Sequence, residues 1–149
     1  MASLLDALAG VWQGRGDGHY PTIAPFEFAE QLTFTPLPGK PIGDYRQRSW
    51  REDGTPLHVE CGYLRVDADR VELMIAQPTG FVEVHHGRFE HSTVEFGITA
   101  LGRSATALAV ATIRRRWQVT DDRLTTDLWM SYGDVIDGHH LRADFRRAV

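Results

Sequence analysis

The chain has 149 residues, of which 42% are hydrophobic, and its formal net charge is −4. This length and apolar content predict one domain, residues 1–149, with one core, and the acidic balance argues against a nucleic-acid-binding protein. The sequence has no run of about 18 apolar residues that would predict a membrane helix, and Asp6 interrupts the stretch where a secretory signal would need its hydrophobic region. The single cysteine, Cys61, excludes internal disulfides and thiolate-bound metal clusters. We therefore expect a cytoplasmic protein in which histidine is the best available metal ligand.

The first predicted element is a short helix over residues 3–9, because Ser3 can act as N-cap and Leu4, Leu5 and Leu8 share one face. After it, polar and apolar residues alternate in short segments separated by Gly, Pro and Asp, which predicts strands. The predicted strands are the glycine-rich segment 10–23 and residues 26–35, 42–51, 57–63, 71–75, 81–89, 93–100, 105–119, 124–132 and 139–149.

The number and spacing of these strands predict an all-β fold. About ten short strands follow one another at intervals of roughly ten residues, with connections short enough for an antiparallel meander. A closed up-and-down β-barrel fits because closure removes exposed edge strands, and a barrel of this size has room for a small ligand. A two-sheet sandwich is the alternative, and spacing alone does not distinguish the two.

The glycine-rich segment offers a first candidate site. Gly14, Gly16 and Gly18 alternate, so they lie on one face of an extended strand and allow close approach by a backbone, an aromatic ring or a flat ligand. A dinucleotide-binding loop is excluded, because neither the G-x-G-x-x-G spacing nor a strand–turn–helix context is present. We favour a bent strand that closes the barrel, with a ligand-binding wall as the alternative.

The same segment carries a family resemblance. The pattern G-x-W-x-G-x-G-x-G-x-Y-P-T-I over residues 10–23, together with Pro25-Phe26, Gln47-Arg48 and residues 62–65 and 76–80, resembles the nitrobindin family. These proteins are haem-binding β-barrels shaped like lipocalins and fatty-acid-binding proteins. The resemblance implies one ferric haem b per chain, reversible binding of nitric oxide and isomerisation of peroxynitrite to nitrate. It implies no nucleic-acid or membrane partner and leaves the oligomeric state open, with a homodimer as one possibility.

The paired histidines His139 and His140 are the second candidate. Leu141 and further alternating residues follow them, so a solvated tail or a tag remnant is a poor explanation. In nitrobindin-like proteins a histidine followed by leucine at the start of the last strand is the axial ligand of the haem iron, and His140-Leu141 matches that pattern. Neutral imidazole is a good axial donor. Strict alternation would place His140 with Arg142 on a charged face, so we expect it at the beginning of the strand, near the barrel mouth.

The resemblance also implies further pocket residues. It places Leu57 and His58 on the far side of the haem and puts Thr22 and Ile23 against its face, although a purely structural role for that loop is the alternative. Met130 matches a pocket position, and its alternation with apolar neighbours independently predicts that it faces inward. His58 shares a strand face with the charged Glu60, which argues instead that His58 points outward. We expect the rest of the distal wall to be apolar, and we expect the run Arg114–Arg116 to be solvated.

A non-enzymatic carrier is the competing function. The same barrel without haem could hold a fatty acid or another apolar molecule. The ligand carboxylate would then need an arginine inside the barrel, for which Arg46, Arg48 and Arg65 are the candidates.

Overall fold

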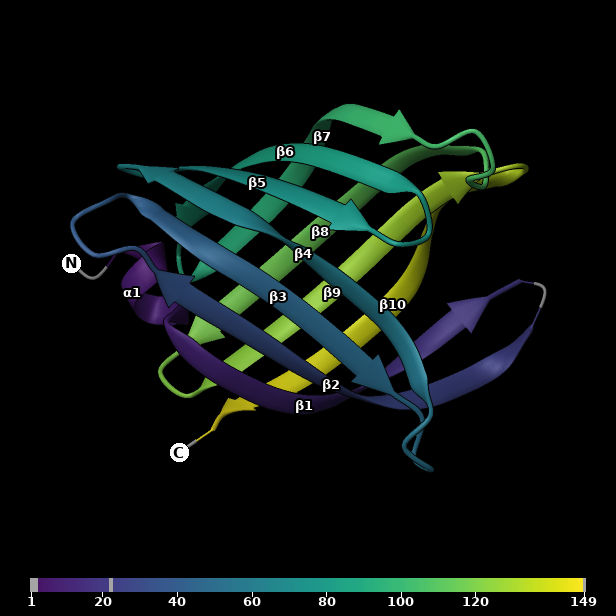
Figure 1. Cartoon of the computed structure of the whole chain (residues 1–149), viewed down its shortest axis with the longest axis horizontal. Helices are drawn as coiled ribbons and strands as arrows, with labels where there is room; N and C mark the ends of the chain where they lie inside the picture. The colour runs from purple at the N-terminus through teal and green to yellow at the C-terminus, as the bar shows by residue number, and fades with distance from the viewer. Residues whose placement is uncertain (1–2, 22, 149) are drawn as a thin grey trace.

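The computed structural model describes residues 3–21 and 23–148, in which one short helix is followed by ten strands (Figure 1). The helix is α1 (Leu4–Leu8). The strands are β1 (Gly10–Tyr20), β2 (Ile23–Pro36), β3 (Ile42–Trp50), β4 (Pro56–Asp67), β5 (Arg70–Gln77), β6 (Phe81–Glu90), β7 (Thr93–Arg103), β8 (Val110–Thr120), β9 (Arg123–Tyr132) and β10 (Val135–Arg147).

The ten strands form a closed antiparallel barrel. Each strand pairs with its neighbours in the chain, and β1 pairs with both β2 and β10, which closes the sheet. The prediction of an up-and-down barrel is therefore confirmed, and the sandwich is excluded. The largest differences from the predicted strand boundaries are in three strands: β8 begins at Val110 rather than at residue 105, β10 begins at Val135 rather than at residue 139, and β4 extends to Asp67 rather than ending at residue 63.

The alternating glycines of β1 make the closure possible. A Cβ atom on Gly14 would lie 2.1 Å from the backbone oxygen of Asp144 in β10. On Gly16 it would lie 2.5 Å from the Phe28 ring. These glycines therefore leave room for the partner backbone and for aromatic rings of β2, which supports the closure strand over a ligand-binding wall.

The helix covers one end of the barrel, opposite the β1–β2 turn (Figure 1). Ser3 caps it with a reciprocal pair of hydrogen bonds: its Oγ accepts from the Asp6 amide at 3.2 Å, and the Asp6 carboxylate accepts from the Ser3 amide at 3.1 Å. The Trp12 indole donates to the Leu8 carbonyl oxygen at 2.8 Å and ties the helix to β1. The buried leucines of α1 join the core that fills this half of the barrel. No helix within the described ranges is long and apolar enough to cross a membrane.

Candidate functional site

The other half of the barrel encloses a cavity of about 960 Å³, which is within the range of small-molecule and cofactor sites. Four of the predicted pocket residues line it: Ile23, Leu57, His58 and Met130. Thr22, the fifth predicted residue of the cavity wall, lies outside the described residues. Part of the wall is apolar and comes from Phe28, Ile113, Trp117, Leu128, Leu141 and Ala143.

His140 lies inside the barrel because β10 contains a bulge. Leu141 pairs with Leu128 and His139 pairs with Trp129, so His140 is an extra residue between two regular pairs. Its side chain is buried, with 1% exposure, whereas His139 faces outward. The expectation that His140 sits at the beginning of the strand was therefore wrong. The bulge lets an inward histidine precede an outward arginine without a break in the strand.

The imidazole of His140 offers one free nitrogen. Its Nδ1 lies 3.1 Å from the carbonyl oxygen of Gly138, which can only accept, so Nδ1 carries the proton. Nε2 then holds a lone pair, yet it is buried and has no hydrogen-bond partner. An unpartnered buried acceptor is costly in a folded protein, and a hydrogen bond from the other ring nitrogen to a backbone carbonyl is what orients a metal-binding histidine. The donor atom therefore fits an axial bond to haem iron.

Two tyrosines pack on the His140 ring. Tyr20, from the end of β1, meets it edge-on with ring centroids 4.5 Å apart, and Tyr132 does so at 5.3 Å. Tyr20 also stacks on Phe26 at 5.8 Å and lines the cavity, so its ring screens the imidazole from that space. Burial, with a smaller contribution from Tyr132, raises the pKa of the Tyr20 phenol.

His58 faces the cavity, which corrects the expectation that it points outward. Its Nε2 lies 3.3 Å from Oε2 of Glu60, and Glu60 itself is buried. The two residues do share a strand face, as predicted, but that face is the interior one. The assumption that a charged neighbour marks the outer face failed because Glu60 has a partner inside the barrel.

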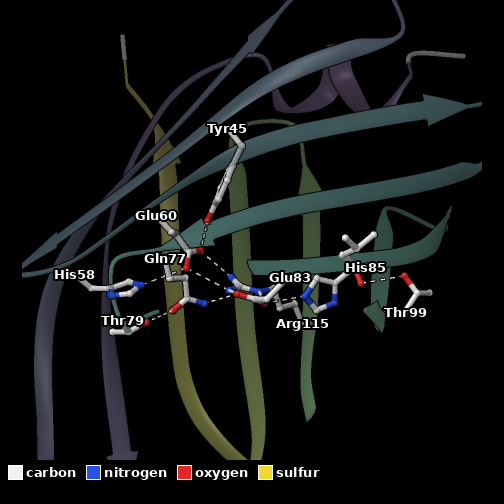
Figure 2. A network of polar contacts seen from close by, with 10 residues as sticks. Tyr45, His58, Glu60, Gln77, Thr79, Glu83, His85, Thr99 and Arg115 are labelled. Carbon is white, nitrogen blue, oxygen red and sulfur yellow. Dashed lines mark hydrogen bonds and ion pairs between the residues drawn. The ribbon is translucent and has the colours of Figure 1, made fainter. Parts of the chain in front are cut away.

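That partner is Arg115, the centre of a buried polar network (Figure 2). Its guanidinium donates to Glu60 at 2.8 and 3.2 Å and to Glu83 at 3.1 and 3.0 Å. Tyr45 adds a hydrogen bond to Glu60 at 2.7 Å, and His85 adds one to Glu83 at 2.8 Å.

Burial of Arg115 overturns two expectations. The run Arg114–Arg116 does split across two faces, but its middle residue is buried rather than solvated. The distal wall is likewise not uniformly apolar. Alternation with Ile113 and Trp117, both apolar and both buried, is the sequence signal that places Arg115 inside.

The network is ionised and carries a net negative charge. Burial alone would raise the pKa of Glu60 and of Glu83, but the Arg115 guanidinium, together with hydrogen bonds from His58 to Glu60 and from His85 to Glu83, outweighs it and holds both pKa values below their usual range. Burial would likewise lower the pKa of Arg115, and the two carboxylates raise it instead. Two carboxylates around one guanidinium leave one negative charge in excess, before any histidine is protonated.

Glu30 is another carboxyl group that lines the cavity beside Glu60. Burial, reinforced by the negative charge of Glu60, raises its pKa to about 8. Glu30 is therefore mostly protonated at neutral pH. The polar side of the cavity thus combines an ionised network with a neutral acid.

The arginines proposed for a fatty-acid carrier are not in the cavity. Arg46, Arg48 and Arg65 are all exposed on the outer face of the barrel. Arg115 is buried instead, and its guanidinium is already paired with Glu60 and Glu83. Within the part of the chain that the structure describes, no three His, Cys, Asp or Glu side chains form a metal-binding group. Among the described residues, two imidazole nitrogens are buried without a hydrogen-bond partner, Nε2 of His140 and Nδ1 of His85. His85 belongs to the polar network through Glu83, so His140 is the better candidate for an axial ligand.

Comparison with known proteins extends over nearly the whole chain. The family model described as "THAP4-like, heme-binding beta-barrel domain" matches residues 2–147. "Peroxynitrite isomerase 1" of Rhodococcus jostii (strain RHA1) is 45% identical over 148 residues, which cover 97% of this chain and 83% of that protein. "Peroxynitrite isomerase 2" of Mycobacterium ulcerans (strain Agy99) is 41% identical, covering 96% of this chain and 94% of that protein. The crystal structure of Rv2717c from M. tuberculosis matches with a TM-score of 0.89 at 36% identity, covering 97% and 95% of the two chains.

Proposed function

Because this chain belongs to the THAP4-like, heme-binding beta-barrel family, we propose that it binds one haem b per chain through His140 and isomerises peroxynitrite to nitrate. Reversible binding of nitric oxide belongs to the same proposal. The observation that carries it is the buried, unpartnered Nε2 of His140. Relatives named peroxynitrite isomerase at 45% and 41% identity support the reaction class.

The residues of the cavity have distinct roles in this proposal. His140 would hold the iron through Nε2, while its Nδ1–H donates to the Gly138 carbonyl oxygen and fixes the ring orientation. Leu57, Met130 and Ile23 line the cavity and would contact the porphyrin. Bound haem would supply a ferric iron with an open coordination position for peroxynitrite or nitric oxide.

His58 lies on the side of the cavity where we expect the small ligand to bind. Its Nε2 proton is held by Glu60, and Glu60 is held in turn by Arg115. This chain of contacts fixes a polar group beside the cavity and keeps its position independent of solvent. We propose that His58 fixes the shape and polarity of this side of the cavity without exchanging a proton, because the conversion of peroxynitrite to nitrate needs no net proton transfer.

A visible spectrum tests the haem site. Protein reconstituted with ferric haem should show a Soret band, which should be lost in His140→Ala and retained in His139→Ala. The two histidines are adjacent, so His139→Ala is a matched control for any general effect of losing an imidazole from β10. Absence of a Soret band in the unmodified protein would contradict haem binding.

Stopped-flow kinetics test the reaction. The decay of peroxynitrite should accelerate in proportion to the concentration of ferric protein, with nitrate as the product. His140→Ala protein at the same concentration should leave the decay at its spontaneous rate. A wild-type rate equal to that of the variant would leave a binding role without catalysis.

A further inference from the structure

Three side chains meet on the outer surface of the barrel, beside the bulge of β10. Asp127 of β9 accepts from His139 Nε2 at 2.8 Å and from Arg142 Nη1 at 3.2 and 3.3 Å. The Asp127 side chain is only 7% exposed, because these two partners cover it. None of these three side chains has a role in the haem site proposed above.

The cluster spans the bulge. His139 is the last residue before the extra position, and Arg142 pairs with Asp127 in the regular ladder just after it. The Asp127 carboxylate therefore accepts hydrogen bonds from β10 both before and after His140.

A second set of contacts holds His139 outward. Its ring packs on Trp129 with centroids 5.1 Å apart, and the Arg114 guanidinium covers the other part of that indole at 3.8 Å from the ring centre. Arg114 is itself paired with Asp137 at 3.0 Å. His139 is thus fixed by an aromatic surface as well as by a charge-assisted hydrogen bond.

The position of the bulge decides which histidine enters the barrel. Adjacent residues of a strand face opposite sides, so a shift of the bulge by one residue would turn His139 inward and His140 outward. Both residues carry the same side chain, which means that the chemistry of the imidazole cannot make the choice. The choice must come from contacts that differ between the two positions.

We propose that Asp127 is a positioning residue that selects His140 as the axial ligand by holding His139 on the outer face. The proposal rests on the proposed haem function. Asp127 contributes to the cavity wall, but its carboxylate is engaged by His139 and Arg142, and we argue that it acts through these two residues. Isolated surface ion pairs contribute little to stability, but the Asp127 carboxylate is buried. Its loss therefore removes both hydrogen bonds that hold the strand on either side of the bulge.

Double variants give the direct test. In the His140→Ala background, haem binding is lost; adding Asp127→Ala should restore a Soret band, because the freed His139 can turn inward. Adding His139→Ala to that pair should abolish the band again. A purely structural role for Asp127 predicts no such return of haem binding.

The rate of haem loss gives a second readout in otherwise unmodified protein. Transfer of haem to apomyoglobin should be about tenfold faster from Asp127→Ala, as is usual when the outer-shell support of a metal ligand is removed. Asp127→Asn should lie closer to wild type, because its amide oxygen still accepts from His139. Asp144→Ala is the matched control: it breaks a 2.9 Å hydrogen bond from Thr125 between the same two strands, away from the bulge.

The outcomes separate the two proposals. If unmodified protein takes up no haem, the proposed function fails. If unmodified protein and His140→Ala behave as expected, but Asp127→Ala matches Asp144→Ala in haem loss and restores no band, the selection by Asp127 is overturned. Far-UV circular dichroism checks folding, and where Asp127→Ala is unfolded, Asp127→Leu, which also removes both hydrogen bonds but keeps more of the side-chain volume, replaces it in both readouts.

Discussion

At the scale of single residues, the Tyr20 ring separates His140 from the cavity that would receive a cofactor. The edge-on contact at 4.5 Å covers the imidazole, and the stacked Phe26 holds the tyrosine in that place. Haem cannot reach Nε2 until the ring moves. Tyr20 is therefore expected to limit the rate of haem uptake.

Removal of that ring should speed the uptake. Tyr20→Ala should raise the association rate of ferric haem several-fold, measured by stopped-flow absorbance in the Soret region. Tyr20→Phe keeps the ring and should behave as wild type, which separates the covering effect from any role of the hydroxyl. Equal rates in the alanine and phenylalanine variants would contradict the covering role.

Glu30 makes a second prediction, on pH-dependent stability. Its pKa is about 8 in the folded protein, above the ordinary value of 4.5, so the fold favours the protonated form. Its contribution to stability is fully present below about pH 4.5 and is lost as the pH rises through about 8. Glu30→Gln should therefore be more stable than wild type at pH 9, on the order of a few kcal/mol, and nearly equal to it at pH 4.

Urea unfolding followed by circular dichroism at several pH values measures this difference. Glu27→Gln is the control, because Glu27 lies on the same strand but is exposed on the outer face. It should follow the wild-type pH profile throughout. A Glu30→Gln profile parallel to wild type would show that Glu30 ionises as freely in the folded protein as in the unfolded chain.

The site was only partly predictable from sequence, and particular residues show why. Met130 was placed correctly, because its neighbours in the strand alternate cleanly. Glu60 and Arg115 were not, because a charged residue on a strand is ordinarily solvated, and their burial depends on a partner from a distant strand. Pairing between β4 and β8 side chains across the barrel leaves no local signal in β4, although in β8 the alternation of Arg115 with the buried Ile113 and Trp117 does mark the inner face.

At the scale of elements, β1 closes the barrel and its glycines are the condition for that closure. Gly14→Ala would place a Cβ 2.1 Å from the Asp144 carbonyl oxygen, which is backbone and cannot turn aside. We expect a loss of about 1–3 kcal/mol in the free energy of unfolding, as for other overpacked sites. Urea unfolding monitored by tryptophan fluorescence measures it.

A second glycine provides the matched control. Gly97 lies in β7, and a Cβ built there meets nothing within 4 Å. Gly97→Ala should therefore be neutral or slightly stabilising, since alanine lowers the entropy of the unfolded chain. If both alanine variants unfold at the same urea concentration, close approach at the β1–β10 seam does not explain the glycine pattern.

The strands themselves were largely predictable, whereas the bulge in β10 was not. Period-two alternation and turn residues located all ten strands, since each strand has one face toward the interior. In β10 the alternation after residue 140 is charged outward and apolar inward, which by itself assigns His140 to the outer face. An extra residue in a strand shifts that pattern by one, and the contacts that hold the bulge come from β9 rather than from β10.

At the scale of the whole molecule, the barrel has one end filled by core and helix and one half hollow. The hollow half combines an apolar wall with a polar wall whose ionised network carries an excess negative charge. Arg115 is the basic group in that network, and two carboxylates already neutralise it. Such an interior favours neutral and apolar ligands over anionic lipids, which sets this cavity apart from one built to hold a fatty-acid carboxylate.

Competition between amphiphiles tests that selectivity in haem-free protein. Dodecanol should displace Nile red, a neutral probe, at a lower concentration than dodecanoate does, because the carboxylate would enter an interior whose buried arginine, Arg115, is already paired with two glutamates. The other arginine on the wall, Arg51, is exposed to solvent. Glu60→Gln removes one of the two charges around Arg115 and should narrow the difference by strengthening dodecanoate. Glu72→Gln, at an exposed position on the outer face of β5, should leave it unchanged. Dodecanoate binding as tight as that of dodecanol in the unmodified protein would instead favour a fatty-acid carrier, because the network would then have to open to release Arg115 to the ligand.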